Sequence, residues 1–600
     1  MRKRWGVILW SSVALIVTAC VCFWGYYTRY PVTPQPSCPG GYYDEAFTLT
    51  LKTNPGATIY YTTDGSTPDE TSRVYSDGIT ICDRSSEPNE YNAIRNVVKD
   101  WYNYYPPEDP VPKGTVVRAV AVNSYGYTSE VLTQTYFVGL TTPSNAYTLS
   151  LVFEKDDLFG PDGIYVTGAQ YDAWYTSETR EGPEPMPNYR FSNEVRVTAE
   201  FLYNDKSVFD QEVGLRIQGA SNRHVAKKRF ILESREEYSG SKFFDRKLFG
   251  DTQTHSVMLK EYTLDALVAD IAKDRDVSAQ DRQVALVYLN GEFWYYTYML
   301  ERFDKTYFRE HYQIENSILV KSGETPEDAN WEGETYEEFL KWVQESDFSD
   351  PVLWAQLNQK VDIQSYIDFI VFNYYLVNCD VCESKNFLLW RSEKKNPLSE
   401  YEDMRWRWCL YDMDAISFAQ YQIPNTVYVE AANTFSDEAP FRINTHILYR
   451  AFYPNPEFRK QFAISFMDIV NNNFAVENME KILHSIGYDI YWMDGFFIKR
   501  PQYAFQHLKE EFELQGELET VTVTTTDVAG GKVIVNTSQL DLSDGLWEGQ
   551  YFTDYPITVT AVANRGYRFA GWRGTTDSKE ATLTLPVDGG VMLEAVFVEA

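Results

Sequence analysis

Apolar and polar residues alternate along much of the first half of the sequence and again near its end. Alternation with a period of two predicts strands that bury one face. Residues 195–203, 211–219 and 227–234 show this pattern, as do short runs within 520–600. Apolar residues at helical spacing follow in 366–378 and 456–487. The sequence therefore predicts a β-rich first half, a helical second half and a β-rich end.

The sharpest local prediction is a β-hairpin over residues 283–300. Two apolar runs flank the dipeptide Asn290-Gly291. A two-residue type I′ turn needs positive φ at both central positions, and Asn-Gly meets that need best. Residues 265–272, just before the hairpin, have the pattern of a helix.

The first thirty residues predict a membrane anchor. The chain opens with a basic tip, and residues 5–27 carry no charge, which is long enough to cross a bilayer core of about 30 Å. Basic residues stay on the cytoplasmic side, so the rest of the chain is expected outside, on a single-pass cell-membrane protein. Two alternatives remain: a lipoprotein anchored at Cys20, which follows Val17-Thr18-Ala19, and a secreted protein with a cleaved signal.

Composition shifts divide the whole chain into segments. We expect an anchor over 1–30, a Pro-rich linker over 31–40, an Ig-like β-sandwich over 41–140, an α+β domain over 145–518 and a small β domain over 519–600. The predicted fold class is thus multidomain, with an N-terminal transmembrane helix.

Charge and composition narrow the function. The formal net charge is −32, which argues against a nucleic-acid partner because such proteins need a basic face. Hydrophobic residues make up 44% and charged residues 23%, as in globular chains. Aromatic residues reach 16%. They indicate aromatic-lined strands or, alternatively, glycan-facing surfaces.

Several polar residues follow strands or helices in an order that suits phosphoryl transfer. A turn at Gly219 precedes a basic strand start at Lys227 and Lys228. Asp380 ends an apolar helix, Asn386 follows it, and a later apolar strand ends at Asp412. Free N–H groups and a Lys hold phosphates, while Asp and Asn oxygens hold Mg²⁺. Each feature alone is more often an ordinary hairpin, cap or turn.

Five segments in this order resemble the CotH kinase family, the spore-coat-type secreted protein kinases with an atypical kinase fold. The segments are 149–168, 214–232, 284–308, 378–391 and 406–418. The resemblance implies an atypical protein-kinase-like central domain. Residues 41–140 resemble the chitobiase/β-hexosaminidase C-terminal-type domain, and residues 520–600 resemble the internalin-B-type bacterial repeat of surface proteins.

The resemblance implies roles for the first half of the site. Lys228 would bind phosphate, with Lys227 on the opposite strand face. Gly219 and Ser221 would lie in the turn that covers the nucleotide. Two further residues have open roles: Arg223 as a phosphate contact or a structural residue, and Glu301 as the partner of the Lys or a structural ion-pair member.

The resemblance also implies roles for the second half. Asp380 would be the catalytic base or hydroxyl-orienting group, and Asn386 a metal ligand. Asp412 would bind Mg²⁺, with Asp414 as a second candidate. Five residues separate Asp380 from Asn386, one more than in ordinary kinase catalytic loops, so Ser384 or Lys385 are alternative neighbours of the nucleotide.

The expected function is an extracytoplasmic serine/threonine protein kinase. It would use ATP with Mg²⁺ or Mn²⁺ and phosphorylate surface or coat proteins. The alternative is a non-catalytic adhesion or envelope-binding protein on a kinase-like scaffold. A third expectation is glycan contact through the flanking β modules.

Overall fold

The computed structural model describes residues 31–219, 221–261, 263–324, 334–382, 384–413, 429–436 and 446–600. These form two compact units, one up to residue 261 with Arg282–Arg302 added, and one of residues 263–281 and 303–600. The two units do not coincide with the predicted domains, and the predicted domain boundaries stay predictions. The predicted anchor over 1–30 and Asp414 lie outside the described residues. Within the described ranges, no helix combines the length and the apolarity that a membrane crossing requires.

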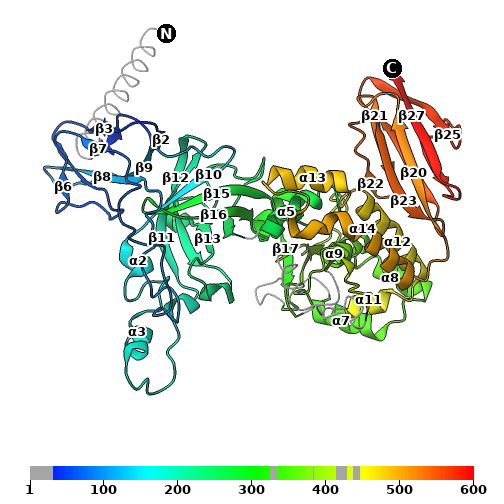
Figure 1. Ribbon diagram of the computed structural model, residues 1–600, viewed down its shortest axis with the longest axis horizontal. Helices are drawn as coiled ribbons and strands as arrows, with labels where there is room; N and C mark the ends of the chain where they lie inside the picture. The colour runs from blue at the N-terminus through cyan, green and yellow to red at the C-terminus, as the bar shows by residue number, and fades with distance from the viewer. Residues whose placement is uncertain are drawn as a thin grey trace, which may run out of the picture. The chain divides into compact units, whose positions relative to one another are not determined.

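The first unit consists mostly of strands (Figure 1). Its strands are β1 (Gln35–Pro36), β2 (Gly41–Tyr43), β3 (Phe47–Leu49), β4 (Leu51–Lys52), β5 (Ala57–Thr62), β6 (Arg73–Val74), β7 (Ile79–Ile81), β8 (Thr115–Asn123), β9 (Leu132–Val138), β10 (Tyr147–Val152), β11 (Glu194–Tyr203), β12 (Lys206–Ile217), β13 (Phe230–Ser234), β14 (Ser256–Lys260), β15 (Arg282–Leu289) and β16 (Glu292–Glu301). Its helices are α2 (Lys155–Phe159), α3 (Ala169–Thr176), η1 (Asn188–Arg190), η2 (Ser221–His224) and α4 (Glu236–Ser239).

Seven of these strands close into a ring. They pair in the order β11-β10-β15-β16-β14-β13-β12, and β12 also pairs with β11. The predicted hairpin is confirmed as β15 and β16, with φ of 45° at Asn290 and 84° at Gly291. The three strands predicted between 195 and 234 are confirmed as β11, β12 and β13, although both lysines precede β13.

The N-terminal strands form a sandwich-like layer that continues the same sheet. Strands β5, β8 and β9 extend from β2, which pairs with β12. Strands β3 and β7 pair separately, and Leu49 and Ile81 pack with Val117 between the two layers. The long connection between β7 and β8 does not stay in this layer. Its residues Tyr91 and Val97 pack in the core of the seven-stranded ring.

A buried carboxyl makes the first unit sensitive to pH. Glu200 on β11 is fully buried and accepts a hydrogen bond of 2.7 Å from the Thr135 backbone N–H. Burial raises the pKa of Glu200 from near 4.5 to about 8. The native state therefore keeps this proton up to about pH 8, whereas the unfolded chain releases it near pH 4.5. The stability that the protonated group contributes is complete below pH 4.5 and is lost as pH rises through 8.

Replacing Glu200 by Gln is expected to flatten this part of the pH profile, because the amide does not titrate. The free energy of unfolding of the variant minus that of wild type should rise as pH increases from 4.5 to 8, by roughly a few kcal/mol in total. Melting temperatures measured across this range test the prediction, with the exposed Glu237→Gln as the matched control. Parallel curves for wild type and Glu200→Gln would refute it.

The second unit combines helices with three small sheets. Its helices are α5 (Thr263–Ile271), α6 (Lys305–Tyr312), α7 (Tyr336–Glu345), α8 (Pro351–Leu357), α9 (Ile363–Tyr375), η3 (Val429–Ala431), α11 (Ile447–Phe452), α12 (Pro456–Asn471), α13 (Val476–Ser485) and α14 (Trp492–Glu511). Its strands are β17 (Ser317–Lys321), β18 (Leu388–Ser392), β19 (Arg407–Cys409), β20 (Leu518–Thr525), β21 (Gly531–Val535), β22 (Ser538–Gln539), β23 (Leu546–Phe552), β24 (Ile557–Ala563), β25 (Tyr567–Gly574), β26 (Thr582–Leu585) and β27 (Val591–Glu599).

Helix α9 is the centre of this unit. It is apolar on nearly all sides and almost completely buried, as expected of a helix that packs on every face. The side chain of Asp362 caps its first turn, accepting from the Ser365 N–H. The predicted helix over 366–378 ends at Tyr375, and Val377 has a φ of 52°.

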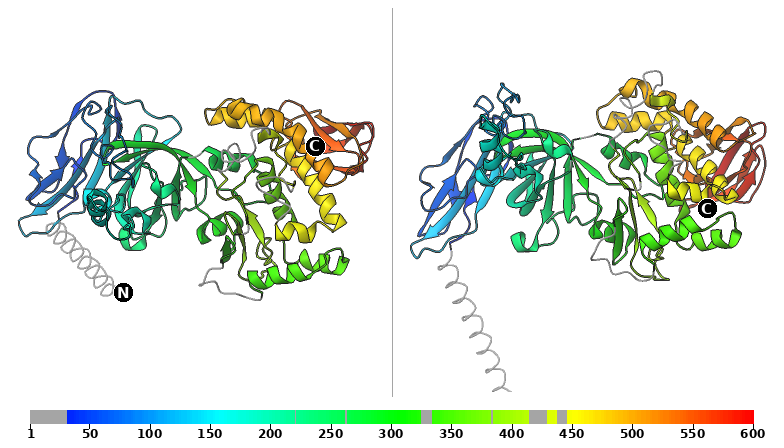
Figure 2. Two further views of the ribbon diagram at one scale, coloured as in Figure 1. Left: turned by 60° about the horizontal axis from the view of Figure 1, so that its bottom comes forward. Right: turned by 90° about the horizontal axis from the view of Figure 1, so that it is seen from below.

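The C-terminal strands confirm the predicted small β domain and pack directly on the helices. Strands β23, β20, β27 and β25 form one sheet, and β22, β21, β24 and β26 form another. Side chains from both sheets share one core with α9, α12 and α14. In all three views the strands coloured orange to red lie against the yellow and orange helices (Figures 1 and 2).

Candidate active site

Asp380 and Asn386 lie at the two ends of a tight turn after α9. The backbones of Cys382 and Lys385 exchange two hydrogen bonds of 2.9 Å, which closes the turn. The Asn386 side-chain amide donates to the Asp380 backbone oxygen (3.0 Å) and to its carboxylate (3.2 Å). These hydrogen bonds bring the two predicted residues together.

Lys385 places a positive charge on this carboxylate. Its ammonium donates to Asp380 Oδ1. The pKa of Lys385 is raised first by this hydrogen bond and also by the charge of Asp412. The charges of Asp380 and Asp412 therefore both stabilise the protonated ammonium of Lys385. From the sequence, Lys385 was expected only as an alternative neighbour of the nucleotide.

Asp412 follows strand β19 in a backbone conformation that few residues adopt. Its φ is 56°, and Asn386 has a φ of 54°; positive φ outside glycine often marks functional positions. The next residue, Met413, donates its backbone N–H to Asp265 on α5 (2.6 Å), which is buried. Asn378 donates to the Met413 sulfur (3.4 Å) and accepts from the Asp380 N–H (3.1 Å). These contacts link the two acidic segments.

The oxygen-rich set in this unit suits a hard divalent cation. Asp380 and Asp412 supply carboxylates, and Asn386 supplies an amide oxygen, the donor types that Mg²⁺ prefers. The amide nitrogen of Asn386 is engaged by Asp380. Within the described part of the chain, nothing donates to its amide oxygen, so that oxygen is available as a ligand.

The predicted nucleotide-covering turn lies in the first unit, after β12. Gly219 has a φ of 96°, which favours glycine. The Arg223 guanidinium donates to the backbone oxygens of Gly219 (2.5 Å), Tyr189 (3.1 Å) and Phe191 (2.7 Å). These bonds hold the turn in place, which favours the structural role that was left open for Arg223. Ser221 begins η2.

Lys228 is fully buried beneath the long β7–β8 connection. Its ammonium donates to the backbone oxygens of Val97 (2.5 Å) and Val225 (2.7 Å) and lies 4.1 Å from the ring centre of Tyr189. Burial lowers the pKa of Lys228 to about 7. Both carbonyls and the aromatic ring stabilise the charged form, as a structural ammonium would require.

Lys227 is the more exposed of the two lysines. Its ammonium donates to the Asn92 side chain and lies 3.3 Å from the ring centre of Trp294. Burial lowers its pKa to about 7, although the charges of Glu292 and Glu261 act in the opposite direction. Glu292 in turn accepts from the Asn92 N–H (2.7 Å). The β7–β8 connection thus contacts both lysines.

Glu301 ends strand β16 opposite Val257 and is buried. The printed partners of the Lys228 ammonium are the backbone oxygens of Val97 and Val225, and the role of Glu301 stays a prediction. The predicted site residues therefore fall into two groups, one on the ring of the first unit and one at the Asp380 turn and Asp412 of the second unit. The residue assignments stay predictions.

Known protein families match most of the chain. Residues 215–519 match the model described as CotH kinase protein, slightly more than half of the sequence. The chain belongs to the CotH kinase family. The CotH region starts within β12 and ends in β20, so it includes the Lys pair, the Asp380 turn and Asp412.

Two further models match on either side of the CotH region. Residues 47–136 match Fn3 associated, and residues 521–600 match the divergent InlB B-repeat domain. The architecture predicted from sequence is therefore found, with the N-terminal module under the Fn3-associated description. No curated protein matches the chain.

Lys228→Met tests whether this lysine is structural. We expect the free energy of unfolding to fall by about 1–3 kcal/mol, because the change removes the donor to the buried Val97 carbonyl and to the partly buried Val225 carbonyl. Chemical denaturation and ATP titration of the same variant provide the readout. Lys227→Met is the matched control and should cost less stability. Lost ATP binding at unchanged stability in Lys228→Met would contradict the structural role and support phosphate binding.

Proposed function

We propose that this CotH family member is an extracytoplasmic protein kinase that transfers the ATP γ-phosphoryl group to a Ser or Thr hydroxyl of a surface or coat protein. Membership of the family supports kinase activity at the family level. The observation that carries the proposal is the turn in which Asn386 and Lys385 converge on the Asp380 carboxylate, with Asp412 close enough to affect Lys385.

In this proposal Asp380 accepts a hydrogen bond from the acceptor hydroxyl and takes its proton. The hydroxyl oxygen forms the new bond to the γ-phosphorus, and the bond from that phosphorus to the β,γ-bridging oxygen breaks, which releases ADP. Asp412 and the Asn386 amide oxygen would hold Mg²⁺ or Mn²⁺, which neutralises phosphate charge when bound. Lys385 would move from Asp380 to a phosphate oxygen as the nucleotide arrives.

Lys227 is the better candidate for the phosphate contact on the first unit, since it is less buried than Lys228. Its bond to Asn92 would have to open. We also propose that the chain is displayed outside the cytoplasm on an N-terminal anchor. This part rests on the charge pattern of residues 1–30.

A non-catalytic binding role is the second candidate. The engagement of both lysines by the β7–β8 connection favours it. Thermal unfolding with and without Mg²⁺ and ATP separates the two functions, since a ligand at 100 times its Kd adds about 2.7 kcal/mol. No stabilisation and no labelling of any acceptor would refute the kinase proposal.

A further inference from the structure

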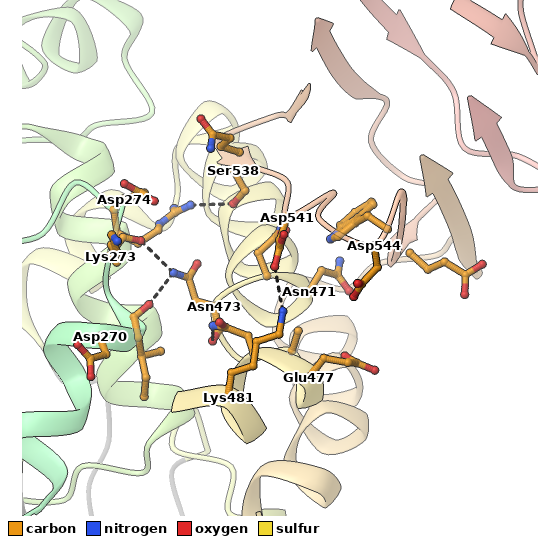
Figure 3. Close-up of a pocket in the computed structure, with 18 of the residues that line it drawn as sticks. Asp270, Lys273, Asp274, Asn471, Asn473, Glu477, Lys481, Ser538, Asp541 and Asp544 are labelled. Carbon is orange, nitrogen blue, oxygen red and sulfur yellow. Dashed lines mark hydrogen bonds and ion pairs between the residues drawn. The ribbon is translucent and has the colours of Figure 1, made fainter. Parts of the chain in front are cut away.

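A cavity of about 550 Å³ lies within the second unit, where the CotH helices meet the C-terminal repeat module. One wall comes from the end of α5 and from the α12–α13 connection, and the other from residues around β22 and β23. Figure 3 shows Asp270, Lys273 and Asn473 on one side and Ser538, Asp541 and Asp544 on the other. The volume falls within the range of small-ligand sites.

Both walls are held in place by direct contacts between the CotH helices and the repeat module. Arg275 donates to Thr537 (3.0 Å) and Ser538 (3.1 Å). Asn471 and Gln550 exchange two hydrogen bonds, 2.8 and 3.0 Å long. A site formed in advance loses less conformational entropy when a ligand binds.

The side chains that line the cavity carry a net negative formal charge. Lys481 forms an ion pair with Asp541 (3.1 Å), and its pKa is raised by that hydrogen bond and by the charges of Asp541, Asp544 and Glu477. Acidic side chains outnumber basic ones along the lining. An anion such as a nucleotide is therefore disfavoured, and a neutral or cationic ligand is favoured.

Asn473 supplies an amide oxygen at the cavity wall. Only 8% of this residue is exposed, and its amide nitrogen donates to the Ile271 backbone oxygen (2.6 Å). In the described ranges of the chain, nothing donates to its amide oxygen. Figure 3 shows the Asn473 amide between the Lys273 side and the Asp541–Lys481 pair. An amide oxygen accepts hydrogen bonds, so this one can accept from a hydroxyl or amine of a ligand in the cavity.

Amide groups and one apolar strip distinguish this lining from a simple acidic surface. Asn472, Asn478 and Gln539 supply amides, which both donate and accept hydrogen bonds, as a hydroxyl does. Leu546 and Trp547 add a short apolar strip. A pyranose ring offers hydroxyls at its edge and an apolar face, whereas an amine or guanidinium offers donors alone.

We propose that this cavity is a carbohydrate-binding site for a neutral or amino-bearing sugar of a glycan. It is independent of phosphoryl transfer, and it would attach the kinase to a saccharide surface. The sugar hydroxyls would donate to the Asn473 amide oxygen and Asp544 and accept from Lys481, while the apolar face of the ring packs on the exposed Leu546.

Isothermal titration of the full chain with cellotetraose, maltotetraose, tetra-N-acetylchitotetraose and tetraglucosamine tests the proposal, with pentalysine as a cationic comparison. Saturable binding of at least one oligosaccharide is expected. The double variant Lys481→Ala/Asp544→Ala should weaken it at least about tenfold. Both residues are on the surface, so the fold should persist, and the exposed Asp577→Ala is the matched control that should bind like wild type.

Three results would overturn the proposal. The first is that none of the four oligosaccharides binds. The second is that the double variant and wild type bind equally. The third is that pentalysine binds as tightly as tetraglucosamine while the uncharged sugars do not, which would make the cavity a cation site. Kinase activity is measured separately, and its loss or retention does not affect this test.

Discussion

Replacing Asp380 by Asn is expected to lower the rate of phosphoryl transfer at least about a hundredfold, as the loss of a positioned general base does. The carboxylate is the group on which Lys385 and Asn386 converge. Asn has nearly the same shape, so the turn should persist. The loss should therefore appear in kcat, measured with saturating ATP and Mg²⁺, and only weakly in the melting temperature.

The matched control for this change is Asp588→Asn, an exposed Asp of the same unit. It should leave both rate and stability unchanged. Asp412→Asn should lose activity together with metal dependence, because it removes a proposed ligand. If Asp380→Asn keeps the wild-type rate, Asp380 is not the base and the register of the catalytic turn is wrong.

Replacing Arg275 by Met is expected to destabilise the second unit by about 3–5 kcal/mol, as the breaking of a buried ion pair does. Arg275 pairs with Asp368 through two bonds of 2.6 and 3.1 Å, and both side chains are almost fully buried. It also donates to Ser465 of α12 and to Thr537 of the repeat module. One substitution thus leaves a buried carboxylate unpaired and loosens the contact between helices and strands.

Denaturant unfolding monitored by tryptophan fluorescence measures this loss. Arg573→Met is the control, because Arg573 forms an exposed pair with Glu594, for which about 0–1 kcal/mol is expected. The double variant Arg275→Met/Asp368→Leu should recover part of the stability, since no charge is left unpaired. Equal effects of Arg275→Met and Arg573→Met would contradict the account.

Local patterns predicted the elements of the fold well. The hairpin of β15 and β16 followed from Asn290-Gly291, because turn chemistry is set by adjacent residues. Packing between modules was not predictable. Asp468 on α12 accepts from Asn536, Thr537 and Tyr551 of the repeat module, yet in the sequence it is one polar residue on a helix. Nothing in its neighbours indicates those distant partners.

The same contrast applies to the candidate site. Asp380 and Asn386 could be placed together because they are close in the sequence, although the turn that joins them was not foreseen. The surroundings of Lys228 could not be predicted, since Val97 lies more than a hundred residues earlier and in another module. The role of Asp265 in holding Met413 was missed for the same reason.

Phosphoryl transfer itself is the most direct test of the central claim. The full chain is incubated with Mg²⁺, γ-³²P-ATP and either casein or histone as acceptor, and labelled residues are identified after hydrolysis. The account predicts label on serine or threonine that depends on Mg²⁺ and is lost in Asp380→Asn. Absence of label on both acceptors and on the chain itself, together with no ATP-dependent stabilisation, would contradict it.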